Sequence, residues 1–353
     1  MAGVRAPVLI DGSFGEGGGA LLRTVLTLSA VTQQPVHVSN IRAATKFPGL
    51  NSEDLTLLKA LAQCCDAELE GATIHSAELG FAPQKRPSGF NGNTKIWEDE
   101  GNDAFANALV VLNSLLPIAA RSGVFSSLTV EGETYGHNIL SFDYFANVTL
   151  SMQSRFGLYA TSRLRRAGFG RYSRGEASLE VEPSGLSGID WQERGDLIAC
   201  RSVIATASVA GSVGERGLSH LAKLGKNAGL SVDGETYEVP SKSPGAFVTI
   251  WAQFEKGLGG ATAMGIKGVR IEAIVQRAFD AFYGWLRSDA TVDTHLADQI
   301  LLTAALADGD TTYTVNNLSQ RFLTMAWATK QFLPIRLTVA GHEGGPGEVS
   351  IRR

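Results

Sequence analysis

Strands and helices alternate along the chain with a period of roughly 90 residues, and this repetition limits the possible folds more than any other feature. In the clearest copy, an apolar strand at 7–10 is followed by a glycine-rich loop and by an apolar, buried helix at 20–29. The pattern predicts an α/β fold built from three repeated units. These units are expected to span about 1–90, 91–186 and 269–353.

The segment between the second and third copies has strand and helix signals of its own. Two strand patterns and one helix pattern occur there, at 201–207, 246–253 and 215–228, before a glycine-rich loop at 256–260. We therefore predict a small α/β domain, 187–268, inserted into a large repeat domain formed by 1–186 and 269–353.

The charge balance excludes a protein that binds nucleic acid through an overall positive charge. Lys and Arg number 31 and Asp and Glu number 35, so no global basic field marks a nucleic-acid binder, and any polyanion site must be local. The three cysteines, two of them adjacent, form no disulfide or zinc pattern, which favours a reducing compartment. With no signal-peptide pattern and no apolar run long enough to span a bilayer, we predict a cytoplasmic protein without a membrane partner.

The loop after the first strand is the first candidate site. Its residues Gly15, Gly17, Gly18 and Gly19 precede a helix whose free N–H groups suit phosphate. Glu16 would repel phosphate unless a divalent cation lay between the carboxylate and the phosphate oxygens. The alternative is a tight turn packed under a neighbouring element.

Arginines form the second candidate site. Arg23 lies in so apolar a helix that its charge needs a partner, and Arg42 ends the next strand. Five more arginines crowd one short segment, at Arg163, Arg165, Arg166, Arg171 and Arg174. This cluster suits bidentate phosphate contacts, and we assign Arg166 and Arg171 to phosphate binding; the alternative is a solvated surface.

Asp298 is the third candidate, at the start of an apolar helix, where a carboxylate also serves simply as a helix cap. The six histidines show no metal-ligand spacing. Each histidine alone is more typical of a structural or surface position than of a catalytic one.

With these residues in view, the chain resembles the RNA 3′-terminal phosphate cyclase family. Residues 11–23, DGSFGEGGGALLR, are similar to the family's opening signature DGxxGEGGGQxLR. Residues 41–50 are similar to its IRAxRxxPGL segment, 296–299 to its LADQ helix and 332–334 to its FLP segment, in the same order over nearly the whole chain. The resemblance implies three βαβαββ-type units with a smaller α/β domain inserted before the third.

The resemblance also implies an ATP-dependent reaction. In the family a histidine attacks the α-phosphorus of ATP, AMP passes to an RNA 3′-phosphate, and the 2′-hydroxyl closes a 2′,3′-cyclic phosphate. We therefore expect ATP with Mg²⁺ or another divalent cation as cofactors, and an RNA 3′ end or nucleotide as partner. The resemblance implies that the loop glycines and Arg23 bind the nucleotide, that Glu16 and Asp298 hold the metal and that Arg42 acts in catalysis. With RNA as the partner, Arg166 and Arg171 are expected to contact RNA phosphates.

The chain departs from the family at the nucleophile. The family pattern SxHxxTN falls on 319–325, SQRFLTM, and places Arg321 at the histidine position. Arginine stays protonated and offers no lone pair for attack on phosphorus. We expect Arg321 to point into the cleft and bind phosphate without forming an adenylate, and His137 or His295 are the candidates to replace the nucleophile. Other departures from the family pattern are Ala20, Thr45 and Asn113.

Three functions remain open from the sequence. The first is a family member that binds nucleotides or RNA 3′-phosphate ends, with cyclase activity only if another nucleophile serves. The second is a non-catalytic, cyclase-like RNA-processing or scaffold protein, which is nucleolar in eukaryotes. The third, by fold analogy with enolpyruvyl transferases, is a transferase acting on a small phosphorylated metabolite.

Overall fold

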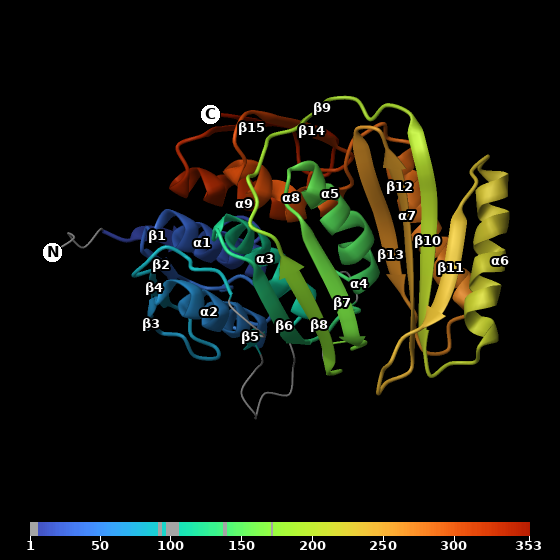
Figure 1. Ribbon diagram of the computed structural model, residues 1–353, viewed down its shortest axis with the longest axis horizontal. Coiled ribbons are helices and arrows are strands. Elements are labelled where there is room, and N and C mark those ends of the chain that lie inside the picture. Colours follow the sequence, from blue (N-terminus) through green and yellow to red (C-terminus); the bar gives the residue numbers. More distant parts are fainter. Residues whose placement is uncertain (1–5, 91–93, 97–105, 137–139, 171) are drawn as a thin grey trace.

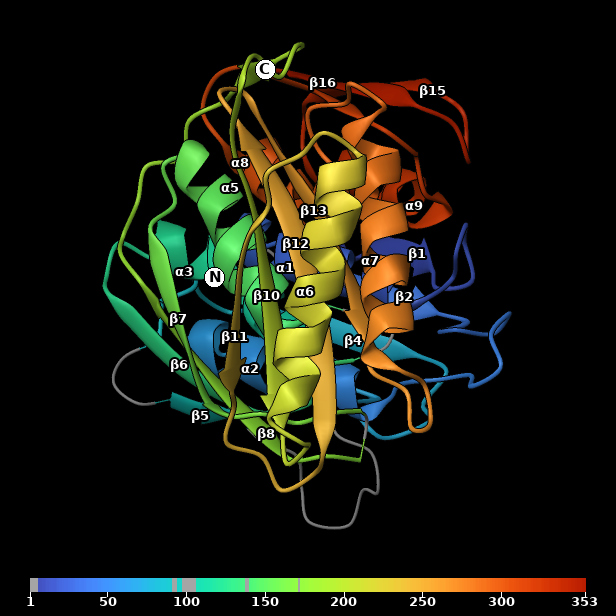
Figure 2. The same cartoon turned by 90° about the vertical axis from the view of Figure 1, so that its right-hand side faces the viewer.

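The computed structural model describes residues 6–90, 94–96, 106–136, 140–170 and 172–353. Three similar units lie together, and a fourth sheet stands beside them with two helices on its outer face (Figure 1). Figure 2 shows this outer face, where α6 (Ser212–Asn227) and α7 (Ile271–Leu286) lie in front of the strands. The predicted α/β fold class is confirmed.

The first unit has the order strand, helix, strand, helix, strand, strand. Its elements are β1 (Val8–Asp11), α1 (Gly19–Thr32), β2 (Val36–Ser39), α2 (Ser52–Cys65), β3 (Glu68–Glu70) and β4 (Leu79–Ala82). β1 and β2 are parallel and the other pairs antiparallel, in the sheet order β1-β2-β4-β3. Asn51 and Asp54 form a capping box at the start of α2, whereas α1 begins after Gly18 without a side-chain cap.

The same pairing pattern recurs in two further units. The second contains β5 (Thr94–Ile96), α3 (Ala108–Arg121), β6 (Ser126–Gly132), α4 (Phe142–Tyr144), the π-helical turn η1 (Phe145–Thr149), α5 (Leu150–Arg155), β7 (Ala160–Arg166) and β8 (Gly175–Val181). The third contains β9 (Asp190–Trp191), α8 (Thr294–Leu306), β14 (Thr311–Val315), α9 (Gln320–Phe332), β15 (Arg336–Gly341) and β16 (Gly347–Arg352). In each sheet the strands of a unit lie in the order first, second, fourth, third, so the βαβαββ unit is present three times.

The inserted segment forms its own sheet, in the order β11-β10-β12-β13. Its elements are β10 (Leu197–Ala207), α6, β11 (Asp233–Glu238), β12 (Gly245–Phe254), β13 (Gly257–Met264) and α7. The prediction of a loop at 256–260 was wrong, because four of these residues belong to β13. The glycines let the strand pack closely: a Cβ on Gly259 would lie 2.5 Å from Cε2 of Trp285.

The predicted domain boundaries at 187 and 268 stay a prediction, but two packing facts favour moving them. β9 pairs in parallel with β14 of the third unit, although it precedes the insertion. α7 packs on β12, β13 and α6, and its apolar face belongs to the core of the inserted segment. We therefore propose that the insertion runs from β10 to α7 and interrupts the third unit after its first strand.

A small aromatic core joins the inserted sheet to the second unit. The Tyr135 ring stacks on Phe169 with centroids 5.0 Å apart and contacts Phe247 on β12 at 5.1 Å. The backbone N–H of Ala167 donates to the Pro240 carbonyl at 2.7 Å. This joint fixes β13 opposite the second unit. Within the described residues no helix is long and apolar enough to span a membrane.

Candidate functional site

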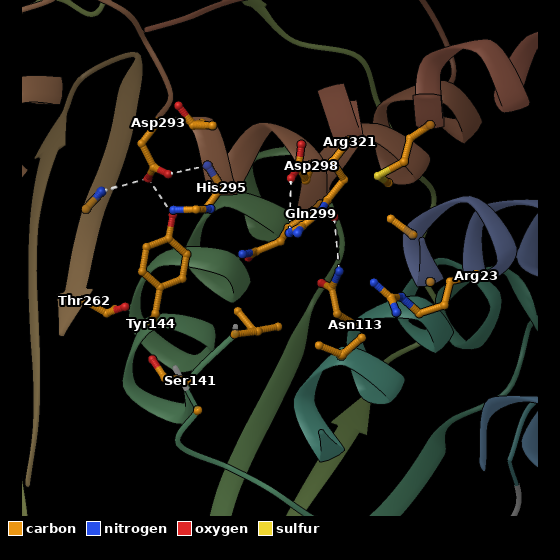
Figure 3. A pocket seen from close by; sticks show the side chains of 18 of the residues that line it. Arg23, Asn113, Ser141, Tyr144, Thr262, Asp293, His295, Asp298, Gln299 and Arg321 are labelled. Atoms are coloured by element: carbon orange, nitrogen blue, oxygen red, sulfur yellow. Dashed lines mark hydrogen bonds and ion pairs between the residues drawn. The ribbon is translucent and has the colours of Figure 1, made fainter. Parts of the chain in front are cut away.

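A cavity of about 720 Å³ lies where the three units meet the inserted segment. Its walls come from the start of α1, from α3, α4, α8 and α9, and from β13 with α7 (Figure 3). One part, here called the charged end, is lined by Glu16, Arg23, Arg42, Glu53, Asp298 and Arg321. The opposite part, toward β13, is called the apolar end and is lined by Leu140, Phe247, Ala261, Ala263, Met264 and Trp285.

The glycine loop is pinned to α9 and also opens toward the cavity. Gly15 has a φ of +63°, and a Cβ there would lie 2.2 Å from Oγ1 of Thr324, which accepts a hydrogen bond from the Glu16 backbone N–H at 2.9 Å. A Cβ on Gly19 would lie 2.5 Å from a guanidinium nitrogen of Arg42 and 2.7 Å from one of Arg23. The loop is therefore both a tight packed turn and a surface on which two arginines meet a helix N-terminus. Gly17 and Gly18 shape this loop without lining the cavity.

Arg23 and Arg42 are each held by a carboxylate from the first turn of α2. Arg23 Nη1 lies 2.7 Å from Oε1 of Glu53. Arg42 Nη2 lies 2.8 Å from both carboxylate oxygens of Asp54, which is fully buried. Sequence reasoning missed Glu53 and Asp54 as site residues, although the acidic first turn of this helix was the available signal. The partner that Arg23 needed is thus Glu53.

Arg321 points into the cavity, as expected, and lies between two carboxylates. Its Nε and Nη2 both lie 3.3 Å from Oε1 of Glu16, and its Nη1 lies 3.9 Å from Oδ2 of Asp298. The Arg321 side chain is 42% exposed, more than twice as much as the Arg23 and Arg42 side chains. Arg321 is therefore the least enclosed cation of the charged end.

Asp298 is a buried carboxyl of the charged end and not the cap of its helix. Burial raises its pKa to about 7 against the opposing effects of the Arg321 charge and a hydrogen bond from Ser319, and the nearby carboxylates Glu16 and Asp293 raise it further. The cap of α8 is Asp293, which accepts from the backbone N–H groups of His295 and Leu296. The helix-cap alternative for Asp298 is therefore wrong.

Asp293 also joins three parts of the protein. Its Oδ2 accepts from the Tyr144 hydroxyl on α4 at 2.5 Å and from the Gly260 backbone N–H on β13 at 2.8 Å. His295 is the second residue of α8, and its side chain is exposed in the cavity wall (Figure 3). The other candidate to replace the nucleophile, His137, lies outside the described residues.

Several buried polar atoms of the cavity wall have no hydrogen-bond partner within the described structure. They are Glu16 Oε2, Thr24 Oγ1, Asn113 Oδ1, Ser141 Oγ, Trp285 Nε1 and Thr303 Oγ1. A buried polar group left unpaired costs about 1–3 kcal/mol, so such groups are rare in stable interiors. Their gathering around one cavity, donors and acceptors together, indicates a surface made to bind a polar ligand.

The predicted metal ligands face each other, but a cation of the protein already lies between them. Glu16 and Asp298 both face the Arg321 guanidinium, and a divalent ion against the same oxygens would meet its positive charge. In the described part of the chain, no three His, Cys, Asp or Glu side chains come together to hold a metal. With Arg321 in this position, the residues do not fit a divalent ion.

The arginine cluster lies away from the cavity. Arg166, on the edge strand β7, donates from Nε to the Arg174 carbonyl at 2.8 Å and lies 3.6 Å from Glu131. Arg163 and Arg165 likewise lie near carboxylates of β8, at 3.9 and 3.4 Å. Arg171 lies outside the described residues. The structure brings neither Arg166 nor its described neighbours to the charged end, so their RNA contact stays a prediction.

Fold and site together define an α/β repeat protein with a polar cavity between its repeats and an inserted segment. A family model described as RNA 3′-terminal phosphate cyclase matches residues 14–339, and the chain belongs to this family. It is 33% identical over 345 residues to the RNA 3′-terminal phosphate cyclase of Methylococcus capsulatus, covering 97% of this chain and 95% of that protein. It is also 33% identical over 358 residues to the one of Methanopyrus kandleri, covering 97% and 98%.

A solved structure, the enolpyruvyl transferase NikO from Streptomyces tendae, is far more distant. It superposes with a TM-score of 0.39 at 12% identity, over 98% of this chain and 49% of that chain. This similarity is too low to support a conclusion about function, and the transferase alternative stays a prediction.

Proposed function

We propose that this protein binds a nucleotide or an RNA 3′-phosphate end in the cavity, and that it forms no covalent adenylate at position 321. One observation carries the proposal: three arginines and a helix N-terminus without a side-chain cap meet at one end of a cavity whose wall holds unpaired buried polar atoms. Backbone N–H groups at a helix start and guanidinium groups are the usual protein ligands of phosphate. Membership of the cyclase family supports the choice of RNA 3′ ends and ATP among phosphate ligands.

The two ends of the cavity suit two parts of such a ligand. Arg23, Arg42 and Arg321 supply cations for phosphate at the charged end. The apolar end supplies the ring of Phe247, the small side chains of β13 and the unpaired Trp285 Nε1. An aromatic face with a few directed polar groups is typical of a site for a nucleobase. We therefore place the phosphate at the charged end and the nucleoside at the apolar end.

A binding titration tests this proposal. Short RNAs ending in a 3′-phosphate or a 3′-hydroxyl are compared, and ATP is titrated separately. We expect the 3′-phosphate to tighten binding at least about tenfold, because several charge-assisted hydrogen bonds go to one phosphate. RNA binding that is indifferent to the terminal phosphate, with no binding of ATP, would instead favour the non-catalytic scaffold.

Covalent chemistry is tested in the same samples with radiolabelled ATP. Arg321 cannot act as a nucleophile, so we expect no acid-labile protein–AMP adduct. A different outcome is favoured by one observation, the exposure of His295 in the cavity wall. An adduct that disappears in the His295→Ala variant would identify this histidine as the nucleophile and the protein as an active enzyme.

A further inference from the structure

We infer that the Arg321 guanidinium takes the position of a divalent cation, so that this site binds phosphate without a metal. The inference rests on the proposed function and names how the same site neutralises its ligand. The juxtaposition that carries it is one cation between two carboxylates, Glu16 and Asp298, that belong to different units of the fold.

The first step is the charge of this corner. Glu16 and Asp298 are 30% and 10% exposed, and Asp293 lies near enough to affect the titration of Asp298. Without a cation, the negative charge of Glu16 in this corner would repel phosphate from the start of α1. Arg321 supplies the positive charge next to Glu16 and Asp298. Arg23 and Arg42 are instead paired with Glu53 and Asp54.

The second step is the availability of the Arg321 donors. The contacts of Arg23 and Arg42 with their carboxylates are short, at 2.7 and 2.8 Å, and hold these guanidinium groups in place. The contacts of Arg321 are long, at 3.3 and 3.9 Å, although a guanidinium carries five N–H donors. Arg321 can therefore keep contact with Glu16 while donating to a phosphate oxygen. A metal ion bridges carboxylate and phosphate oxygens in the same way.

The third step is the exclusion of a divalent ion from Glu16 and Asp298 by the charge of Arg321. A divalent ion placed on Glu16 or Asp298 would lie next to the fixed positive charge of Arg321, which cannot lose its proton. The unpaired Glu16 Oε2 is one buried oxygen and supplies a single ligand. Removal of the guanidinium would leave both carboxylates uncompensated and open this corner to a metal.

Two measurements test the inference on the full chain. Binding of RNA with a 3′-phosphate is compared with the 3′-hydroxyl form, in Mg²⁺ and in EDTA at equal ionic strength. For the natural protein we expect the affinity ratio of the two RNAs in EDTA to lie within about twofold of the ratio in Mg²⁺. For Arg321→Gln and Arg321→Ala we expect the ratio in EDTA to fall about tenfold and to recover partly with Mg²⁺. Arg352→Ala is the matched control, because this arginine is 45% exposed, pairs with Asp310 and does not line the cavity.

The second measurement uses Mn²⁺ alone, followed by electron paramagnetic resonance. We expect at least about tenfold tighter Mn²⁺ binding to Arg321→Gln than to the natural protein, because a neutral amide no longer repels the ion. Equal Mn²⁺ binding by both, or loss of the phosphate ratio in EDTA, would overturn the inference. If the 3′-phosphate does not tighten binding of any RNA, the proposed function fails. The Mn²⁺ comparison still decides whether Arg321 keeps a divalent ion away from Glu16 and Asp298.

Discussion

The two ends of the cavity are built on opposite principles. At the charged end each of the three arginines has a carboxylate partner within 4 Å, so the cations are fixed in place before any ligand arrives. At the apolar end most side chains are neutral, Arg277 is held by the Met264 carbonyl at 2.9 Å, and Ser141 Oγ and Trp285 Nε1 are buried without partners. A ligand meets cations that already have carboxylate contacts at one end, and unpaired polar atoms among apolar side chains at the other. The charged end therefore selects by charge, and the apolar end selects by shape and by a few hydrogen bonds.

The strongest way to alter the charged end is to supply the missing nucleophile. Arg321→His places an imidazole beside Glu16, on a helix that begins one residue earlier. With ATP and Mg²⁺ we expect an acid-labile protein–AMP adduct to change from undetectable to nearly stoichiometric, because a neutral histidine has the lone pair that arginine lacks. Radiolabel transfer measures the adduct, and Arg321→Gln is the control. No adduct with the histidine in place would mean that the charged end no longer positions ATP for attack.

The apolar end can be filled without touching the charges. Thr262 is half-buried on β13 and faces the cavity. An indole at this position occupies the space we assign to the nucleoside, so Thr262→Trp should weaken ATP binding about 100-fold. Tripolyphosphate, which has no base, should bind as before. Calorimetric titrations of both ligands, with Thr262→Val as the control, measure the difference. Equal losses for both ligands would refute the division of the cavity into two ends.

A third prediction separates charge from geometry at the charged end. Arg23→Lys keeps the positive charge near Glu53 but removes the planar guanidinium fork. We expect about tenfold weaker binding of RNA with a 3′-phosphate and no change for the 3′-hydroxyl form. Fluorescence titration measures both affinities, and thermal unfolding checks that the fold is intact. If the lysine variant bound equally well, Arg23 would act only as a diffuse charge.

Stability provides a fourth prediction, at the joint beneath the apolar end. Asp143 on α4 accepts a hydrogen bond from the Tyr237 hydroxyl of β11, and burial raises the pKa of its carboxyl to about 6. A folded-state pKa above the unfolded value means that this group's contribution to stability is complete at low pH and is lost as the pH rises through about 6. A difference of about two pH units corresponds to about 3 kcal/mol of lost stability near neutral pH.

Asp143→Asn removes this dependence. We expect the variant to melt a few degrees higher than the natural protein at pH 7.5 and the gap to shrink toward pH 4.5. Melting curves across this range measure the effect. A constant gap at all pH values would show that Asp143 does not titrate in this window.

The smallest effect on RNA affinity is expected from a substitution outside the cavity, at Arg166. Arg166 contacts the Arg174 carbonyl and Glu131 on the sheet of the second unit. Arg166→Ala should leave the affinity for a 3′-phosphate within about twofold, in contrast to Arg23→Lys. The same fluorescence titration decides this. A loss comparable to that of the Arg23 variant would extend the phosphate site to β7.

The sequence predicted what depends on neighbouring residues and missed what depends on distant ones. The glycine loop before α1 is local, and its position between a strand and a helix could be predicted from the order of residues along the chain. The pairing of Arg23 with Glu53 joins residues 30 positions apart, and no local pattern specifies it. β13 was missed because glycine disfavours strands in general, while here Trp285 occupies the space that a side chain would need. Asp298 was expected as a possible cap because the true start of α8, at Asp293, lies a turn earlier.

One contact described above also affects how this protein meets other chains. β13 is the edge strand of the inserted sheet, and an edge with free N–H groups invites a strand from another molecule. The Gly260 N–H is occupied by Asp293, and the Leu258 N–H is occupied by the Thr291 carbonyl. The first half of the strand that forms the apolar wall of the cavity is thereby closed to sheet extension. The carboxylate that joins the cavity walls therefore also protects this part of the sheet edge.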